Sequence, residues 1–280
     1  MDRRRRELER RAASGEPAAQ VELRRFRARE GERIFAVIGC VHSNLEALEA
    51  VLADIAALGV ERVICLGDVV GYGPDPEACL DRVQASCELV LLGNHEEALV
   101  HGSYAFSLYS RQAIEWSRPR LGEERLEYLR GLLLQFREAG DLFVHGSPRD
   151  PTCEYILPEH ELGVPSVPAK QKYDEIFAAV ERRLFVAHSH QPNLIAGPEA
   201  KVLPITFGSP IDLSGLEKSI VNVGSVGQPR DRDTRACWVL VEGPCVTWRR
   251  VPYDLERTVS KIEAIPELND NLGLRLQRGV

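Results

Sequence analysis

The sequence predicts an α/β fold in which buried strands alternate with helices. Three short apolar runs, each ending in glycine, have the length of buried strands: residues 34–39, 62–67 and 88–93. Helical segments separate these runs, and short strand candidates dominate the second half of the 280-residue chain. This order indicates sheets covered by helices, with the chemistry expected at the carboxyl ends of the strands.

The first 32 residues are expected to form a helical extension. Residues 4–29 lack Gly and Pro except at a break at 15–17, which favours two short helices. The extension carries ten Arg against seven Asp or Glu, in alternating sign. Such a pattern is typical of a solvated helix face. A docking segment for an acidic partner, or for another subunit of a homo-oligomer, is the alternative.

The main domain is expected to span residues 33–265. Its first helix has Asn44 as a suitable N-cap and ends at Gly59. Residues 104–136 interrupt the alternation with two amphipathic helices, which we interpret as a cap insertion. The rest of the elements follow in order: strands at 141–146 and 182–190, a helix at about 170–181 between them, several short strands, and a last helix near 254–264. Residues 266–280 are left as a C-terminal tail.

Composition and charge restrict the classes of protein that the chain can belong to. Its 44% hydrophobic and 28% charged residues are ordinary for a globular protein. No apolar run approaches the roughly 20 residues of a membrane span. The net charge of −7 argues against a general nucleic-acid binder. Seven scattered cysteines without an export signal predict reduced thiols and a cytoplasmic location.

Polar residues suited to metal binding follow almost every predicted strand. They are Cys40, His42, Asp68, Asn94, His95, His145, His188 and His190. Hydrolysis of a phosphate ester requires a nucleophile at neutral pH and positive charge close to the phosphoryl oxygens. Two cations about 3.5–4 Å apart supply both. Asp68 could bridge them, imidazoles could complete both sites, and Asn94 adds a neutral oxygen ligand.

At these positions the sequence resembles the calcineurin-like metallophosphoesterase superfamily. The matching stretches are CVH at 40–42, GD at 67–68, GNHE at 93–96, VHG at 144–146 and AHSH at 187–190. Three sequence motifs are similar to those of a bacterial branch of this superfamily that includes small phosphodiesterases and dinucleoside-polyphosphate hydrolases. These motifs are GDVVGYGPDP, VHGSPRDP and GSVGQPRD. The resemblance covers about residues 33–252 and implies a four-layer α/β/β/α sandwich.

The resemblance also implies a site that holds two divalent ions of Mn, Fe or Zn. One ion would be bound by Cys40, His42, Asp68 and His190. The other would be bound by Asp68, Asn94, His145 and His188. His95 would donate a proton to the leaving group, with Glu96 as a neighbour that tunes it, or would only support the site through hydrogen bonds. Substrate contacts are expected from Asn94, Gln228 and Arg230, and catalysis from His95 and Asp68.

Cys40 stands where the family has aspartate, and the sequence leaves its role open. A thiolate would complete a Cys/His/His/Asp set that suits tetrahedral zinc or iron. Alternatively, this metal site is weak or empty and only the second is filled. In the third interpretation Cys40 is a bystander beside a site completed by water, or a deliberately altered residue.

Two functions are consistent with these observations. The first is a metal-dependent phosphohydrolase that cleaves small-molecule phosphate mono- or diesters, nucleotides or dinucleoside polyphosphates among them, with a metal-bridging hydroxide. The second is a catalytically weakened or inactive metal-binding regulatory protein, because of Cys40. The cap insertion would select the substrate. Aromatic residues that could stack on a base or aryl group are Tyr72, Tyr104, Tyr109 and Trp116, with core packing favoured for Trp116.

Overall fold

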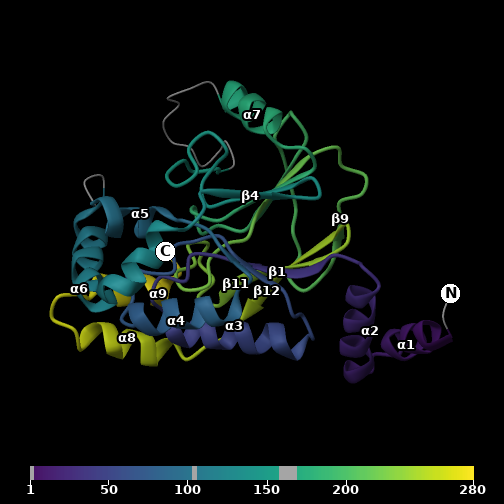
Figure 1. Ribbon diagram of the computed structural model, residues 1–280, viewed down its shortest axis with the longest axis horizontal. Coiled ribbons are helices and arrows are strands. Elements are labelled where there is room, and N and C mark those ends of the chain that lie inside the picture. Colours follow the sequence, from purple (N-terminus) through teal and green to yellow (C-terminus); the bar gives the residue numbers. More distant parts are fainter. Residues whose placement is uncertain (1–2, 103–105, 158–168) are drawn as a thin grey trace.

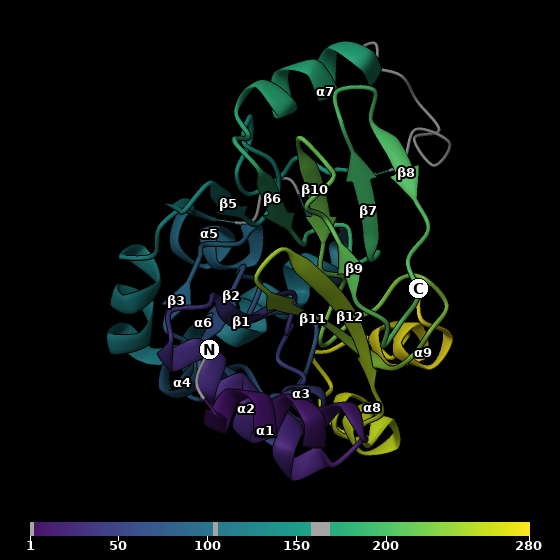
Figure 2. The ribbon, with the colours of Figure 1, turned by 90° about the vertical axis from the view of Figure 1, so that its right-hand side faces the viewer.

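The computed structural model describes residues 3–102, 106–157 and 169–280, which form four stacked layers of helices and sheets (Figures 1 and 2). Two sheets face each other. Most of the helices cover the outer side of the first sheet, and α7 (Ala169–Ala178) covers the outer side of the second. This arrangement confirms the four-layer α/β/β/α sandwich.

The first sheet combines strands from both ends of the domain. Its order is β3-β2-β1-β11-β12-β9, and β1 is parallel to β2 but antiparallel to β11. The bounds of its strands are β1 (Ile34–Ile38), β2 (Val63–Cys65), β3 (Leu89–Val90), β9 (Ile211–Asp212), β11 (Ala236–Glu242) and β12 (Cys245–Val251). Strands β1, β2 and β3 lie within the three apolar runs that end in glycine, which confirms the strands predicted there.

The second sheet has the order β4-β5-β6-β10-β7-β8. Because β5 and β6 are parallel, the residues that follow them lie at the same edge of the sheet. The bounds of its strands are β4 (Gln135–Glu138), β5 (Asp141–Val144), β6 (Arg183–Val186), β7 (Asn193–Ala196), β8 (Lys201–Leu203) and β10 (Ser219–Asn222). The sequence did not indicate β4, which pairs with β5 in an antiparallel hairpin.

The apolar runs are continuous because both faces of these strands are buried. In β1, Phe35 and Val37 face the second sheet, whereas Ile34, Ala36 and Ile38 face the helices. Between the sheets, the rings of Phe143 and Phe185 stack with centroids 5.0 Å apart, and Phe35 meets both edge-on. This inter-sheet core holds the carboxyl ends of strands from both sheets near each other.

The helical layer on the first sheet contains α3 (Leu45–Ala57), α4 (Pro76–Ser86), α5 (Asn94–His101), α6 (Leu108–Arg130) and α8 (Leu255–Glu263). The predicted cap of α3 is confirmed, since Oδ1 of Asn44 accepts a hydrogen bond from the Ala47 amide at 3.1 Å. Gly122 has non-helical backbone angles inside α6, so the two helices predicted for this segment meet there. Trp116 is buried in an apolar cluster with α8 and α9 residues, as expected from its helical spacing.

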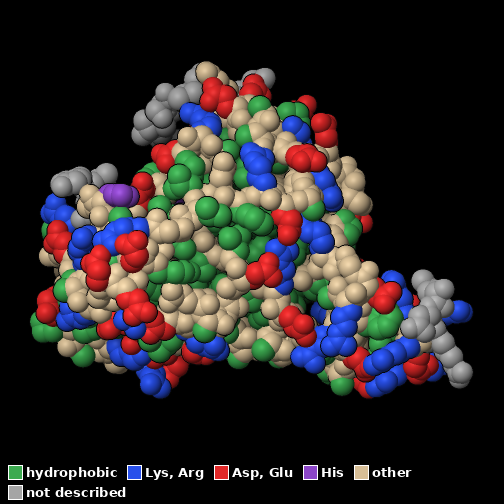
Figure 3. All heavy atoms as spheres, viewed as in Figure 1, with side chains coloured by type: hydrophobic (Ala, Val, Ile, Leu, Met, Phe, Trp, Pro, Cys, Tyr) green, Lys and Arg blue, Asp and Glu red, His purple; other side chains and the backbone are tan. Residues whose placement is uncertain are grey.

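Both ends of the described chain are helical. The extension forms α1 (Arg3–Ala13) and α2 (Pro17–Arg29), which lie together beside the main body (Figure 1). Figure 3 shows basic and acidic side chains intermixed over this extension. The segment left as a C-terminal tail contains α9 (Asn271–Arg278), which packs against α8. In the part of the chain that the structure describes, every helix is too short or too polar for a membrane crossing.

A buried ion pair stabilises the contact between the sheets. Asp141, at the start of β5, binds Arg183 through two hydrogen bonds of 2.7 and 2.6 Å, and both residues are buried. Its carboxylate also accepts a hydrogen bond from Arg33 at 2.7 Å. Arg33 precedes β1, so Asp141 connects the two sheets. Removal of Asp141 would leave the Arg183 guanidinium buried without its counter-charge.

We therefore expect Asp141→Ala to lower the free energy of unfolding by about 3–5 kcal/mol. Asp81→Ala is the matched control, because it breaks an Arg125 pair on the surface and should cost about 0–1 kcal/mol. Urea unfolding followed by circular dichroism measures both. Equal losses of stability in the two variants would contradict the role of the Asp141 pair.

Candidate metal centre

The candidate residues gather at one edge of the sandwich, where strands of both sheets end. Each follows a strand directly: Cys40 and His42 follow β1, Asp68 follows β2, Asn94 follows β3, His145 follows β5, and His188 and His190 follow β6. The structure thus brings together residues that are up to 150 positions apart in the sequence. All seven metal ligands that the sequence predicts are in this cluster.

The residues form two groups that could each hold a metal ion. Cys40, His42, Asp68 and His190 make the first group, and Asp68, His145 and His188 make the second, with the ligand atoms of each group within 4.8 Å of one another. All six of these side chains are buried. Asn94 adds an oxygen to the second group, since its Oδ1 lies 3.2 Å from Nε2 of His145.

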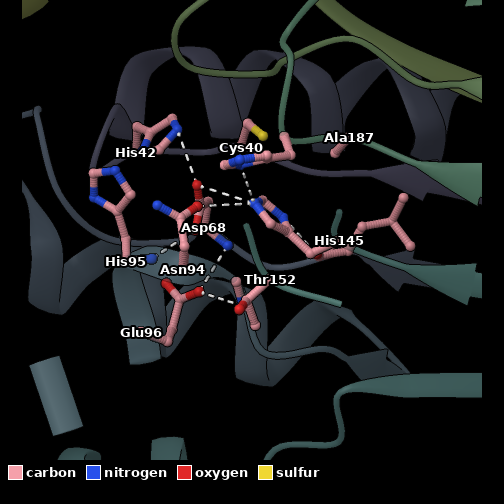
Figure 4. Close-up of polar contacts among 12 residues, drawn as sticks. Cys40, His42, Asp68, Asn94, His95, Glu96, His145, Thr152 and Ala187 are labelled. Atoms are coloured by element: carbon pink, nitrogen blue, oxygen red, sulfur yellow. Dashed lines mark hydrogen bonds and ion pairs between the residues drawn. The ribbon is translucent and has the colours of Figure 1, made fainter. Parts of the chain in front are cut away.

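Asp68 is shared by both groups. Its Oδ1 accepts a hydrogen bond of 2.9 Å from the backbone amide of His95. Its Oδ2 lies 3.6 Å from Nε2 of His42 and 3.3 Å from Nε2 of His145. Figure 4 shows these two rings directed at the carboxylate from different sides. A single carboxylate oxygen therefore faces both groups, which is the arrangement of a bridging ligand.

Backbone carbonyl groups fix the orientation of all four histidine rings. A carbonyl oxygen only accepts hydrogen bonds, so the ring nitrogen facing it carries the proton. The proton-bearing nitrogens and their acceptors are Nδ1 of His42 with Val70 at 3.2 Å, Nδ1 of His145 with Leu66 at 2.9 Å, Nδ1 of His190 with Gln228 at 2.6 Å and Nε2 of His188 with Cys153 at 3.0 Å. The other nitrogen of each ring is left to face the centre.

These free nitrogens face one another at short range. Nε2 of His42 lies 3.1 Å from Nε2 of His190, and Nε2 of His145 lies 3.1 Å from Nδ1 of His188. Two lone pairs at this distance repel each other unless a cation or a proton lies between them. The donor set therefore fits metal ions, and each imidazole is held in the tautomer that metal binding requires.

Burial keeps three of the rings neutral. It lowers the pKa of His42 and His190 well below the usual range and the pKa of His188 to about 3. His145 differs: although burial opposes it, the Asp68 carboxylate raises the pKa of His145. A proton on His145 consequently competes with a cation for the same position.

Cys40 lies in the same cluster with its thiol fully buried. Burial raises the pKa of this thiol well above its usual value, and the negative charge of Asp68 acts in the same direction. A cation in the first group would reverse this preference, because metal coordination deprotonates a thiol. The first group can therefore use Cys40 as a ligand only when an ion is present.

At several residues of the site, the backbone adopts a left-handed conformation that residues other than glycine rarely take. Residues with positive φ within or beside the two groups are Cys40, His42, Ser43, Asp68, Tyr72, His188 and His190. Each such conformation costs on the order of 1 kcal/mol or more. The surrounding contacts must offset this cost, and they keep the ligand atoms directed at one point.

Glu96 provides one of these contacts. The sequence suggested Glu96 as a neighbour that tunes His95, and in the structure its carboxylate accepts four backbone hydrogen bonds of 2.7–3.1 Å. The donors are the amides of Asp68, Val69, Val70 and Gly93. Glu96 thus holds the turn that carries Asp68. Gly93 is required there, because a Cβ atom at this position would lie 2.2 Å from Oδ1 of Asp68.

His95 lies beside the first group. Its ring is 4.7 Å from the His42 ring and 4.6 Å from the Tyr72 ring, measured between centroids. It is buried, and burial lowers the pKa of His95 to about 4. Nδ1 of His95 has no hydrogen-bond partner among the described residues. It faces Gly71, where a Cβ atom would approach to 2.0 Å, so this close packing fixes the ring.

A cleft of about 350 Å³ opens beside the second group. Asn94, His188 and Arg230 contribute to its wall. Gln228 is buried, and its Oε1 accepts a hydrogen bond of 2.8 Å from Arg230. Gln228 therefore orients Arg230 and, through its carbonyl oxygen, His190.

Several residues that line this cleft were not predicted from the sequence, Tyr155 and Arg275 among them. Tyr155 stacks on His188, with ring centroids 4.1 Å apart. Arg275 enters the cleft from α9. Tyr155 follows the VHGSPRDP motif closely, and this proximity is a signal from which its place near the site could have been predicted. Arg275 lies outside the matched motifs, so only the packing of α9 reveals it. Tyr72 also lines the cleft, and Tyr104 lies outside the described residues.

The role of Glu96 leads to a prediction. Glu96→Gln would point amide hydrogens at backbone amides, so we expect the Asp68 turn to loosen and metal affinity to fall by roughly 10- to 100-fold. Glu97→Gln is the control on the same helix, since its amide oxygen can still accept the 2.6 Å hydrogen bond from Thr152. Titration with Mn²⁺ or Zn²⁺ by calorimetry measures the affinities. Unchanged affinity in Glu96→Gln would contradict this role.

This chain is similar to known proteins over most of its length. A model of the calcineurin-like phosphoesterase family matches residues 34–213. The uncharacterized protein MJ0912 of Methanocaldococcus jannaschii is 33% identical over 257 residues, which cover 88% of this chain and 98% of that protein.

Two crystal structures are also similar to this chain. A metallophosphoesterase from Sphaerobacter thermophilus has a TM-score of 0.76 at 34% identity, covering 88% of this chain and 99% of that one. PH1004 of Pyrococcus horikoshii OT3 has a TM-score of 0.70 at 22% identity, covering 88% and 98%, and so supports the fold. The chain therefore belongs to the calcineurin-like phosphoesterase family and is a metallophosphoesterase, with a cysteine in one of its candidate metal-binding groups.

Proposed function

We propose that this protein hydrolyses phosphate mono- or diesters of small molecules at a centre of two divalent metal ions. The observation that carries the proposal is the pair of facing nitrogens in each group, 3.1 Å apart, with every ring oriented by a backbone carbonyl. Such an arrangement is costly in a metal-free core, and two cations relieve it. The reduced thiol of Cys40 suits a cytoplasmic location.

The two ions would be held by the ligands that the sequence predicts. Cys40, His42, Asp68 and His190 would hold one, and Asp68, Asn94, His145 and His188 would hold the other. When bound, two cations supply a water of low pKa and neutralise charge on the phosphoryl oxygens. The mixed nitrogen, oxygen and sulfur donors favour Zn, Fe or Mn over Mg or Ca.

The remaining residues of the site would act on the substrate directly. Arg230 has N–H groups that can pair with phosphoryl oxygens, and Gln228 fixes its position. His95 would assist the leaving group. Its ring is neutral at neutral pH, but an anionic phosphate beside it would raise its pKa and allow it to hold and donate a proton. Asp68 would hold both ions at a fixed separation.

The proposal is tested by the metal content and activity of His188→Ala. We expect about two ions per wild-type chain purified without chelator, and fewer in the variant. Hydrolysis of p-nitrophenyl phosphate and bis-p-nitrophenyl phosphate with Mn²⁺ should fall by at least about 100-fold. His101→Ala changes an exposed histidine outside both groups and should retain wild-type values. Wild-type activity in His188→Ala would refute the proposal.

Substitutions of Cys40 test whether the cysteine weakens the enzyme. A carboxylate donates less charge than a thiolate, so Cys40→Asp should leave the metal a stronger Lewis acid and raise the Mn²⁺-dependent rate by roughly threefold or more. Cys40→Ser removes the thiolate without supplying a carboxylate and should lower the metal content of the first group. Equal rates in wild type and Cys40→Asp would show that position 40 does not govern catalysis.

A further inference from the structure

Tyr72 lies against the metal centre in a backbone conformation that residues other than glycine rarely adopt. It belongs to the loop that follows β2 and Asp68, and its φ is 61°. Its side chain is buried. A left-handed conformation costs a residue of this kind on the order of 1 kcal/mol or more, so contacts of the side chain must offset the cost. Such strain concentrates at functional sites, which directs attention to those contacts.

The ring of Tyr72 contacts two histidine rings of the site. Its centroid lies 4.7 Å from that of His42 and 4.6 Å from that of His95. The glycines on either side of Tyr72 allow the loop to come this close. A Cβ atom at position 71 would lie 2.0 Å from Nδ1 of His95, and one at position 73 would lie 2.4 Å from the carbonyl oxygen of His42. The loop is therefore shaped around these two histidines.

The orientation of the His95 ring depends on this packing. Nδ1 of each of His42, His145 and His190 is bound by a backbone carbonyl oxygen, whereas Nδ1 of His95 has no hydrogen-bond partner among the described residues. Besides Tyr72 and His42, the His95 ring meets Phe106 edge-on, with centroids 5.1 Å apart. Phe106 is only half-buried, so the buried ring of Tyr72 is the firmer of the two aromatic supports.

The hydroxyl group of Tyr72 connects the site to the helical layer. It accepts a hydrogen bond of 3.1 Å from Oγ of Ser110, in α6, and one of 3.4 Å from Nη2 of Arg230. Arg230 also donates from this nitrogen to Oε1 of Gln228 at 2.8 Å. The ring of Tyr72 thus supports His95, and its hydroxyl group supports the arginine expected to bind phosphate.

We propose that Tyr72 is a positioning residue that holds His95 in the orientation for protonating the leaving group. The inference rests on the proposed phosphohydrolase function. As the P–O bond to the leaving group breaks, the proton of His95 passes to the departing oxygen and the imidazole becomes neutral. A catalytic group must be held close to its productive geometry for such a step, and the packed ring of Tyr72 provides this support.

Esters with different leaving groups test the proposal, because proton donation matters most for a basic leaving group. Phenyl phosphate releases a far more basic oxygen than p-nitrophenyl phosphate does. In Mn²⁺-loaded Tyr72→Leu, we expect kcat for phenyl phosphate to fall roughly ten- to hundredfold and kcat for p-nitrophenyl phosphate to stay within about threefold. If the wild type prefers diesters, diphenyl phosphate and bis-p-nitrophenyl phosphate form the equivalent pair.

Tyr72→Phe keeps the ring and removes only the hydroxyl group. It should retain the wild-type ratio of the two kcat values and raise KM for both esters about two- to fivefold, because Arg230 loses a hydrogen bond. If Tyr72→Leu does not fold, Tyr72→Asn takes its place, since asparagine tolerates the left-handed backbone.

Tyr173→Leu is the matched control, because Tyr173 is a buried tyrosine of α7 on the outer side of the second sheet. It should change both rates by the same factor. Equal losses for the two esters in Tyr72→Leu, or no loss for either, would overturn the proposal. A ratio as low in Tyr72→Phe as in Tyr72→Leu would also overturn it.

The His95 ring offers a measurement that does not depend on turnover. In nitrogen-15 NMR spectra of the histidine rings of the Zn²⁺-loaded protein, the His95 signals should be narrow in wild type and Tyr72→Phe and broadened in Tyr72→Leu. His95→Gln assigns these signals. If the wild type hydrolyses no phosphoester, the proposed function fails, but the spectra still decide whether Tyr72 fixes the His95 ring. Identical His95 signals in wild type and Tyr72→Leu would refute that role.

Discussion

The main physical constraint on this site is the repulsion between imidazole nitrogens that face one another in the core of the protein. His42 and His190, and likewise His145 and His188, present unprotonated nitrogens to each other at 3.1 Å. Backbone carbonyls on the outer side of each ring exclude the alternative tautomer. Positive charge between the rings would relieve this repulsion, so the site is suited to receive cations before any substrate arrives.

The fold supplies the forces that hold this unfavourable arrangement together. Strands of both sheets end at one edge, and the inter-sheet core around Phe35 and Phe143 keeps those ends close. Glu96 fixes the turn at Asp68 through four backbone amides, and Gly93 leaves room for the carboxylate. Positive φ angles at Cys40 and other ligands show that local backbone preference yields to these contacts.

Much of this could be predicted from the sequence, because strand ends in an α/β fold converge. Apolar runs that end in glycine located β1 and β2, and the polar residues after them located the ligands. The backbone contacts of Glu96 and the position of Arg275 in the cleft could not be predicted. Glu96 acts on backbone atoms of a distant turn, and Arg275 reaches the cleft only because α9 packs against α8. Both depend on tertiary contacts, which residue patterns do not encode.

As a ligand, Cys40 would make this centre softer than one built from oxygen and nitrogen ligands alone, and the oxygen of Asp68 that faces both groups would link the two ions. The central claim is that two cations occupy the two groups. Anomalous X-ray diffraction from crystals loaded with Zn²⁺ or Mn²⁺ tests it most directly. The account predicts two anomalous peaks, one within the group of Cys40, His42 and His190 and one within the group of His145 and His188. Absence of both peaks at saturating metal would contradict it.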